Sequence, residues 1–254
     1  MPRICPDVPA AQKPSQVELC KAVILKTQSY SDTRKIIHVY SLEKGYLSLM
    51  SPSFLFKRKN NPVHLMQVSE IEYSGNERSR FQQLNTISPL LNLPALYFDV
   101  VKMNILLLWG EVLDLLLKNE GKNEALFEFV VRSVEYLNSA TQGIGNFNLL
   151  FLYRLAGLIG YRIHSESWQE GYVFSIQDGG FHPADDGAAR ISGPNTATAI
   201  HRLCTCPVHE AKDIPLNQSA RNTLLDIIFL FYTTHLGIDF NIKSIQVIRE
   251  IFQK

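Results

Sequence analysis

Four residues between positions 201 and 209 could bind a metal ion: Cys204 and Cys206, together with His201 and His209. Thiolate sulfur and imidazole nitrogen are the ligands that zinc prefers in structural sites. The paired cysteines of such sites are usually separated by about two to four residues, so that both sulfurs reach one tetrahedral ion across a tight turn. Cys204 and Cys206 have a single residue between them, and no second pair follows. The spacing favours two inert thiols, and we expect no bound metal.

His182, with Asp185 and Asp186, could bind a divalent cation or act in acid–base catalysis. In a segment so rich in glycine, such charges are more typical of a solvated loop. The sequence has no nucleophile elbow and no P-loop, and the GIG at 143–145 lacks the third glycine and the preceding strand of a dinucleotide-binding motif. We therefore expect no catalytic residue and no cofactor. A hydrolase that uses His182 and the two aspartates is the least favoured alternative.

Lysine and arginine gather in three short segments of the N-terminal third, where they could neutralise the phosphates of a nucleic acid. A single basic run is usually a solvated turn, but three basic segments on one small domain favour a surface that binds a polyanion. Aromatic side chains that could stack on bases lie close by in the sequence: Tyr30, Phe54, Phe56 and Phe81. The candidate nucleic-acid contacts are Lys26, Arg34, Lys35, Lys57, Arg58, Lys59, Arg78 and Arg80.

The segment that carries these cations has the pattern of β-strands. Short runs rich in β-branched and aromatic residues alternate with turns, and in one run Ile36, His38 and Tyr40 alternate with Ile37 and Val39. The predicted strands cover 22–25, 35–41, 45–50, 64–73 and 81–87. Five short strands at this spacing predict a small barrel or a meander, because an open sheet of this size would leave unpaired edges.

From Pro94 onward, the apolar residues recur with a period of about 3.6 instead of two, which is typical of amphipathic helices. Glycines divide this part into separate helices, because glycine readily adopts the left-handed conformation at a helix end. The expected ends are Gly121, Gly143 and Gly160, and two further helices are predicted at 219–234 and 244–252. The expected buried positions include Val101, Ile105, Leu108, Val112, Leu115, Ala125, Phe129, Val130, Val134, Leu137, Phe147, Leu150, Phe151, Leu155, Leu158, Ile159, Leu224, Leu225, Ile228 and Phe231.

Residues 161–200 are rich in glycine and proline, with one strand-like piece at 172–175. We expect a loop-rich insertion at about 161–215 that contains one hairpin. The first residues of the chain include four prolines and no periodic pattern, which predicts a disordered extension. The expected architecture is α+β: an extension at 1–20, a five-stranded barrel at 21–93 and a helical domain at 94–254.

The 254 residues carry a formal net charge of +1, and 46% of them are apolar, as in a globular protein. The charge is uneven, with ten Lys and Arg against five Asp and Glu between Lys21 and Ala95. A basic module on a mildly acidic body suggests that one end contacts a polyanion. The sequence shows neither a secretory signal nor an uncharged apolar run of about 18 residues. We therefore expect a cytoplasmic protein without membrane contact, in which the four cysteines stay reduced.

Several stretches resemble those of the bacterial RecO family, in the same order along the chain. They are KAVILKT (21–27), YSDT (30–33) and IIHVYS (36–41) near the start, FNLLFLYRLAGLIG (147–160) in the middle, and HL (235–236) with KSIQVIREIF (243–252) at the end. The basic run at 57–59 lies where that family has a basic loop after the third strand. The closing stretch is most similar to RecO proteins of Bacteroides-like bacteria.

The resemblance implies an N-terminal OB-fold and a non-enzymatic mediator of DNA repair and recombination, associated with the nucleoid. Such a protein binds single- and double-stranded DNA, docks on the C-terminal tail of single-stranded-DNA-binding protein, joins RecR, helps to load RecA and anneals complementary strands. The helical body would supply an apolar groove with a basic rim for the acidic tail, although no motif names its residues. Many RecO proteins have a four-cysteine zinc site after the middle stretch, but residues 161–183 contain no cysteine, so zinc is not expected here.

The alternative is a protein-interaction adaptor whose OB module does not bind DNA. The two hypotheses differ in their response to salt. Phosphate contacts weaken steeply as the salt concentration rises, whereas an apolar peptide groove responds little.

Overall fold

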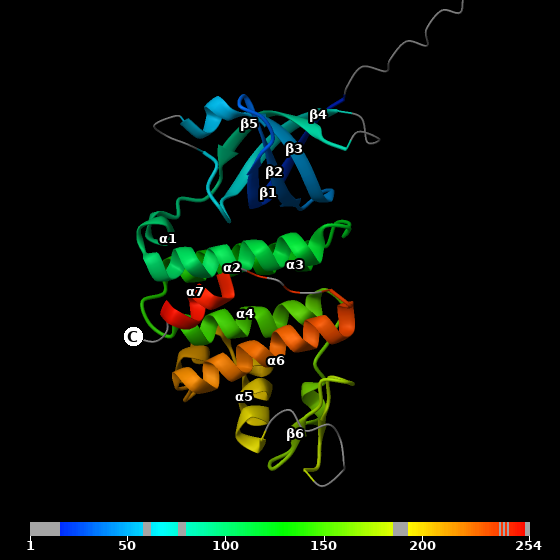
Figure 1. The fold of residues 1–254 in the computed structure, drawn as a ribbon, viewed down its shortest axis with the longest axis vertical. Coiled ribbons are helices and arrows are strands. Elements are labelled where there is room, and N and C mark those ends of the chain that lie inside the picture. The colour runs from blue at the N-terminus through cyan, green and yellow to red at the C-terminus, as the bar shows by residue number, and fades with distance from the viewer. Residues whose placement is uncertain are drawn as a thin grey trace, which may run out of the picture.

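The computed structural model of the chain describes residues 16–57, 62–75, 80–184, 193–238, 240, 242 and 244–251. Its long axis runs from a small β-barrel, through stacked helices, to a short hairpin (Figure 1). Three candidate nucleic-acid contacts, Arg58, Lys59 and Arg78, lie outside the described residues, as do Asp185 and Asp186. None of the helices in the described ranges is both long enough and apolar enough to cross a membrane.

Five strands close into a barrel in the order β1-β2-β3-β5-β4, which confirms the expected OB-fold barrel. Neighbouring strands are antiparallel, except for a short parallel pairing between β3 and β5. The bounds are β1 Gln16–Ser29, β2 Arg34–Ser41, β3 Gly45–Pro52, β4 Val68–Gly75 and β5 Gln82–Pro89, with the 3-10 helix η1 at Ser53–Lys57. β1 begins ahead of the expected domain start at Lys21, because Gln16 and the residues after it pair with β4.

The alternation along each strand gives the barrel two different faces. Ile37 and Val39 point inward and belong to the barrel's own core, together with Ile24 of β1. Leu25 and Tyr40 point outward and belong to the larger core that the helices form. The outer face of β1 and β2 is therefore apolar where the helical domain covers it, and the barrel shares its core with that domain.

Helix α2 (Val100–Leu117) lies directly against this outer face (Figure 1). A Cβ atom at Gly110 would lie 2.6 Å from the carbonyl oxygen of Leu25, so only glycine permits this approach. The loop after α2 is also bonded to the barrel, since the Tyr40 hydroxyl donates to the Gly121 carbonyl at 3.0 Å. The Tyr46 amide donates to the Glu120 carbonyl at 3.2 Å. These contacts hold the barrel and α2 together as one unit.

The helical domain stacks further layers below α2 (Figure 1). Trp109 of α2 stacks on Phe151 at a ring distance of 3.8 Å, and its indole N–H donates to the Asn148 side chain at 2.9 Å. Side-chain oxygens of Asp99, Asn123 and Asn217 cap the first turns of α2, α3 and α6. Apart from α2 and α5 (Pro194–Thr205), the described α-helices are α1 Pro94–Phe98, α3 Glu124–Ser139, α4 Ile144–Leu158, α6 Gln218–Leu236 and α7 Ser244–Ile251.

Most of the predicted apolar stripes are buried, including Ile105 and Phe147. Two positions were wrongly predicted to be buried: Leu115 is 38% exposed, and Ala125 is also exposed. Leu115 lies on the more exposed side of α2, whereas its neighbour Leu116 is 8% exposed. A sequence stripe of about 100° does not decide which of two adjacent leucines faces the core.

The insertion contains the expected hairpin, formed by β6 (Val173–Phe174) and β7 (Phe181–His182). The insertion expected at about 161–215 also contains regular structure that the sequence pattern did not predict: α5 (Pro194–Thr205) and the 3-10 helix η3 (Val208–Asp213). α5 buries Ala197, Ala199, Ile200 and Leu203. Half of these positions are alanine, so the helix lacks the leucine-rich stripe by which the others were recognised.

Candidate nucleic-acid interface and peptide groove

A cavity of about 460 Å³ opens where the outer face of the barrel meets the C-terminal end of α2. β1, β2, β3 and the start of β5 form one side, and α2 forms the other. We call it the barrel–helix pocket and define it by Lys26, His38, Tyr46, Phe81, Asp114 and Lys118. The pocket lies beside the part of the barrel's outer face that α2 covers. Its floor therefore includes outward-pointing strand residues such as His38, which lies on the same side of β2 as Tyr40 of the shared core.

An imidazole and a phenol stack at the floor of this pocket. The rings of His38 and Tyr46 lie 5.8 Å apart with an angle of 27° between their planes. The His38 Nδ1 atom lies 2.9 Å from the Ser48 hydroxyl. Burial lowers the pKa of His38 from its usual value of 6.5, so the ring is neutral at pH 7. A neutral imidazole adds no charge to the floor, and both rings offer a surface for stacking.

The cations of the pocket differ in what they contact. The Lys26 ammonium forms a 2.8 Å ion pair with one carboxylate oxygen of Asp114. The other oxygen accepts a hydrogen bond from the Tyr46 hydroxyl at 2.6 Å. Both carboxylate oxygens of Asp114 are therefore occupied. The Arg80 guanidinium lies 5.2 Å from the centre of the Phe81 ring, and Lys118 is exposed. Arg80 and Lys118 form no ion pair with any described residue, so they can reach an incoming phosphate.

A second group of the candidate cations lies at the end of the barrel. Lys35 sits 4.4 Å from the centre of the Phe56 ring, and Lys57 is the exposed last residue of η1. The rings of Tyr30 and Phe81 meet edge to face at 6.0 Å. Since Phe81 also lines the pocket, the barrel end and the pocket are parts of one continuous surface.

The structure brings Lys26 and Arg80 into the same pocket. Sequence reasoning did not identify His38, Tyr46 or Lys118 as part of it. The sequence did contain a signal for His38, because a lone histidine interrupts an otherwise apolar outward face of its strand. It held none for Lys118, which reaches the pocket only because α2 packs on the barrel.

A larger cavity, of about 740 Å³, lies between α3, α4 and the end of α5. We call it the helical groove and define it by Phe129, Arg132, Tyr136, Arg154, Arg162 and Cys204. Phe129 stacks on the buried Phe151 at 5.2 Å, so its ring is anchored in the core. The resemblance implied an apolar groove with a basic rim in the helical body, and this cavity is the candidate for it.

Three arginines give the helical groove a basic rim. Arg154 donates to the backbone carbonyls of Leu203 and Cys206, so it ties α4 to the end of α5. Arg132 pairs with Glu128 at 2.8 Å and Arg162 pairs with Glu166 at 3.1 Å. The side chains of Arg132 and Arg162 are 77% and 69% exposed, and such pairs contribute little, so both remain available to an acidic ligand.

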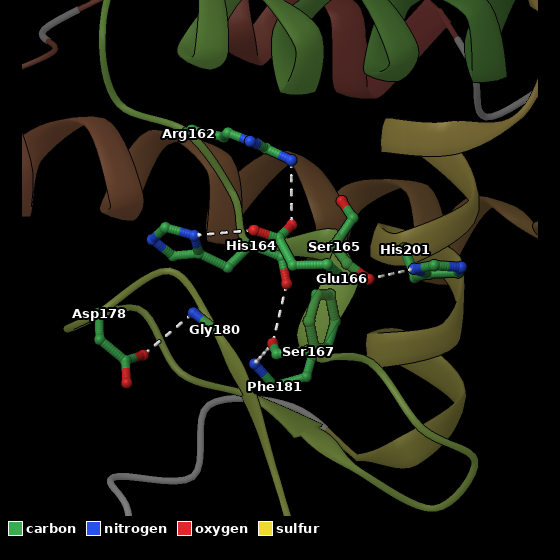
Figure 2. A network of polar contacts seen from close by, with 9 residues as sticks. All are labelled: Arg162, His164, Ser165, Glu166, Ser167, Asp178, Gly180, Phe181 and His201. Atoms are coloured by element: carbon green, nitrogen blue, oxygen red, sulfur yellow. Dashed lines mark hydrogen bonds and ion pairs between the residues drawn. The ribbon is translucent and has the colours of Figure 1, made fainter.

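The hairpin region, where many RecO proteins have cysteines, is held by polar contacts (Figure 2). The Phe181 amide donates to the Ser167 hydroxyl at 2.9 Å, and the Gly180 amide donates to Asp178 at 3.0 Å. The His201 Nδ1 atom lies 3.1 Å from the Ser165 carbonyl oxygen, which joins α5 to the 3-10 helix η2 (Ser165–Ser167). Backbone and side-chain hydrogen bonds therefore hold the hairpin region together.

The donors near Cys204 and Cys206 do not fit a zinc site. Burial raises the pKa of the Cys204 thiol to about 12, so it is protonated at pH 7 and is a poor ligand. His201 bonds to a carbonyl and stacks on Trp168 at 4.5 Å. Within the ranges that the structure describes, no three His, Cys, Asp or Glu side chains are grouped so that they could hold a metal ion.

Comparison with known proteins decides the family. The family model described as "Recombination protein O C terminal" matches residues 97–244, more than half of the chain. The chain belongs to the RecO family.

Relatives named DNA repair protein RecO cover most of the chain. The one from Phocaeicola vulgatus is 27% identical over 91% of this chain and 97% of its own length. The one from Christiangramia forsetii is 28% identical over 91% and 98%, and that from Porphyromonas gingivalis is 26% identical over 85% and 91%. The expected family is thus confirmed, and this RecO-family chain has a role in DNA repair and recombination.

Proposed function

We propose that this chain is a non-enzymatic recombination mediator. In this proposal the barrel binds single- and double-stranded DNA, and the helical groove binds the acidic C-terminal tail of single-stranded-DNA-binding protein. The chain then works with RecR to help load RecA, and it anneals complementary strands. The relatives' name, DNA repair protein RecO, supports the general role. The observation that carries the DNA-binding part is the barrel–helix pocket, in which exposed cations surround stacked aromatic rings.

Binding of DNA to this surface needs no bond chemistry. Arg80 and Lys118 would neutralise phosphates and release their condensed counterions, and the aromatic rings would stack on bases. The candidate cations Arg34, Lys35 and Lys57 extend the basic surface over the barrel end. Lys26 takes a different part, because its ammonium already compensates Asp114 at 2.8 Å. Arg58, Lys59 and Arg78, which lie outside the described residues, remain predicted DNA contacts.

The helical groove suits an acidic peptide with an apolar end. Its aromatic floor, formed by Phe129, Tyr136 and Phe147, would bury apolar side chains of the tail. Arg132 and Arg162 at the rim would pair with carboxylates. Competition for the tail would bring the mediator to strands that are already coated, and this supports loading of RecA without any catalytic residue.

A titration of a fluorescein-labelled 20-nucleotide strand at two salt concentrations tests the DNA-binding part. We expect affinity to fall steeply with salt, by about 0.7 in the logarithmic slope for each phosphate contact. Affinity that does not change with salt, or no binding at all, would instead support the adaptor hypothesis, in which the barrel does not bind DNA.

The peptide part needs its own variant. Changing Arg132 and Arg162 together to alanine should weaken binding of a labelled single-stranded-DNA-binding-protein tail peptide by about tenfold, since each removes a charge-assisted contact. Lys44→Ala, on the barrel, is the matched control and should leave peptide affinity unchanged. Equal affinity in the double variant and the wild type would exclude the groove as the tail site.

A further inference from the structure

The barrel–helix pocket is closed on one side by a wall that cannot move away freely. Five-stranded barrels of this type bind oligonucleotides on the face of strands 2 and 3. Here, α2 packs on β1 beside that face, and its Asp114 side chain bonds to both Lys26 of β1 and Tyr46 of β3. Gly110 sits against the backbone of Leu25. A ligand must therefore enter a slot between strand and helix instead of lying on an open sheet.

The size of the slot selects the form of the ligand. A cavity of about 460 Å³ is of the size that takes a small molecule such as a nucleotide. A duplex keeps its bases paired and stacked in its interior, so it has no free base face to insert without unpairing. A single strand can turn one base outward at a much smaller cost.

The inner part of the pocket has the chemistry for a base. His38 is neutral and stacks on Tyr46, and Phe81 provides a further ring. Hydroxyl and amide groups of Ser48 and Gln82 line the same cavity and can bond to base edges. The only described carboxylate that lines the pocket, Asp114, is compensated by Lys26.

The mouth of the pocket has the chemistry for a phosphate. Arg80 and Lys118 are exposed, and they come from opposite walls, the barrel and the end of α2. Neither forms an ion pair with another part of the chain that the structure describes. Two exposed cations, one from each wall, focus a positive potential at the point where the backbone of an entering strand would lie.

We infer that the barrel–helix pocket receives one unstacked nucleotide of a single strand, whereas a duplex contacts only the cations at the barrel end. This inference rests on the proposed function, because it divides one DNA-binding surface into two parts. The pocket makes the chain discriminate single strands from duplexes without reading the base sequence.

Phe81→Ala tests the base-binding part. The probes are a fluorescein-labelled single strand and a labelled hairpin duplex with the same number of phosphates. Loss of one stacking ring should weaken single-strand binding by about tenfold and change duplex binding by less than about twofold. Phe98→Ala is the matched control, because Phe98 is 89% exposed on the helical domain. It should change neither affinity.

Lys118→Glu tests phosphate binding at the mouth of the pocket, and it changes an exposed side chain only. It should weaken single-strand binding by about tenfold, flatten its salt slope by about 0.7 or more and spare the duplex. Lys212→Glu, an exposed lysine on η3 of the helical domain, is the control of equal charge. Because Lys118 is exposed, this variant remains informative even where Phe81→Ala disturbs the barrel.

The outcomes separate the two proposals. Equal losses for strand and duplex in both variants, or no loss in either, would overturn the nucleotide pocket while leaving DNA binding intact. A wild-type chain that binds neither probe would overturn the proposed function itself, and the pocket with it. Loss confined to the single strand in both variants supports the inference.

Discussion

The barrel–helix pocket and the helical groove are both basic cavities, but they are built differently. The pocket joins distant parts of the chain, and its ion pair links Lys26 of the barrel to Asp114 of α2. Apart from aromatic rings, the pocket presents mainly polar side chains, and the charge of its carboxylate, Asp114, is compensated by Lys26. The groove joins consecutive helices, has an aromatic floor and carries its arginines on an exposed rim.

This difference separates two ways of using positive charge. In the proposed function, the cations and polar groups of the pocket bind a polyanion, so affinity for DNA should depend strongly on salt. In the groove, buried apolar area should supply most of the affinity and the arginines should mainly orient the peptide. Under this proposal, one chain would bind DNA and a protein tail at once, and the two affinities would differ in their sensitivity to ionic strength.

The largest effect should come from separating the barrel from α2. Gly110→Ala places a Cβ atom 2.6 Å from the Leu25 carbonyl oxygen and 2.9 Å from the Leu65 side chain. We expect a loss of about 1–3 kcal/mol from overpacking and a Tm lower by several degrees. The control is Gly157→Ala on α4, where the added Cβ would meet no described atom within 4 Å beyond its chain neighbours and the nearby backbone of its own helix. It should raise stability by up to about 1 kcal/mol, as expected for alanine in a helix. Thermal melts of both variants check this, and equal melting temperatures would contradict the close approach.

The basic run should affect DNA binding and spare the groove. Changing Lys57, Arg58 and Lys59 together to alanine should flatten the salt slope for single strands by about two units. Tail-peptide affinity should stay at the wild-type value, because the groove lies in the helical domain. Fluorescence titrations of both ligands measure this. If the folded variant loses affinity for both DNA and the peptide, both sites lie on the barrel, and the assignment of the peptide to the helical groove is wrong.

A smaller effect should distinguish Lys26 from Arg80. The double variant Lys26→Ala with Asp114→Asn removes one charge of each sign, so single-strand affinity should stay within about twofold of wild type. Arg80→Ala should lower the salt slope by about 0.7, as expected for one phosphate contact. If the double variant flattens the slope as much as Arg80→Ala does, Lys26 contacts phosphate directly.

The smallest effect concerns pH. Burial lowers the pKa of His38 below 6.5, so the unfolded chain binds this proton at a higher pH than the folded chain does. The stability linked to His38 is full above about pH 6.5 and decreases as the pH falls towards the lower folded value. Between about pH 7.5 and 5.5, the wild type should therefore lose more Tm than His38→Gln. Equal losses would show that the ring is not desolvated.

Local pattern was enough to predict much of the fold. The alternation at Ile36–Tyr40 predicted strand β2, and the apolar stripe that contains Ile105 predicted helix α2. Both patterns are periodicities of neighbouring residues, so they can be read from the sequence alone. The strand-like piece at 172–175 predicted the hairpin. The missed helix α5 depends on alanines, whose small side chains are buried only because neighbouring helices approach closely.

For the site, the sequence by itself determined the supply of cations and aromatic residues on the barrel and the apolar periodicity of the helices. Only the tertiary structure decided which of them meet. Lys118 and Asp114 enter the pocket because Gly110 lets α2 approach Leu25, a contact between distant parts of the chain that no local pattern encodes. Lys26 changes from a free cation to the partner of a carboxylate for the same reason. Charge is a property of each residue, whereas what a charge is paired with depends on how distant elements pack.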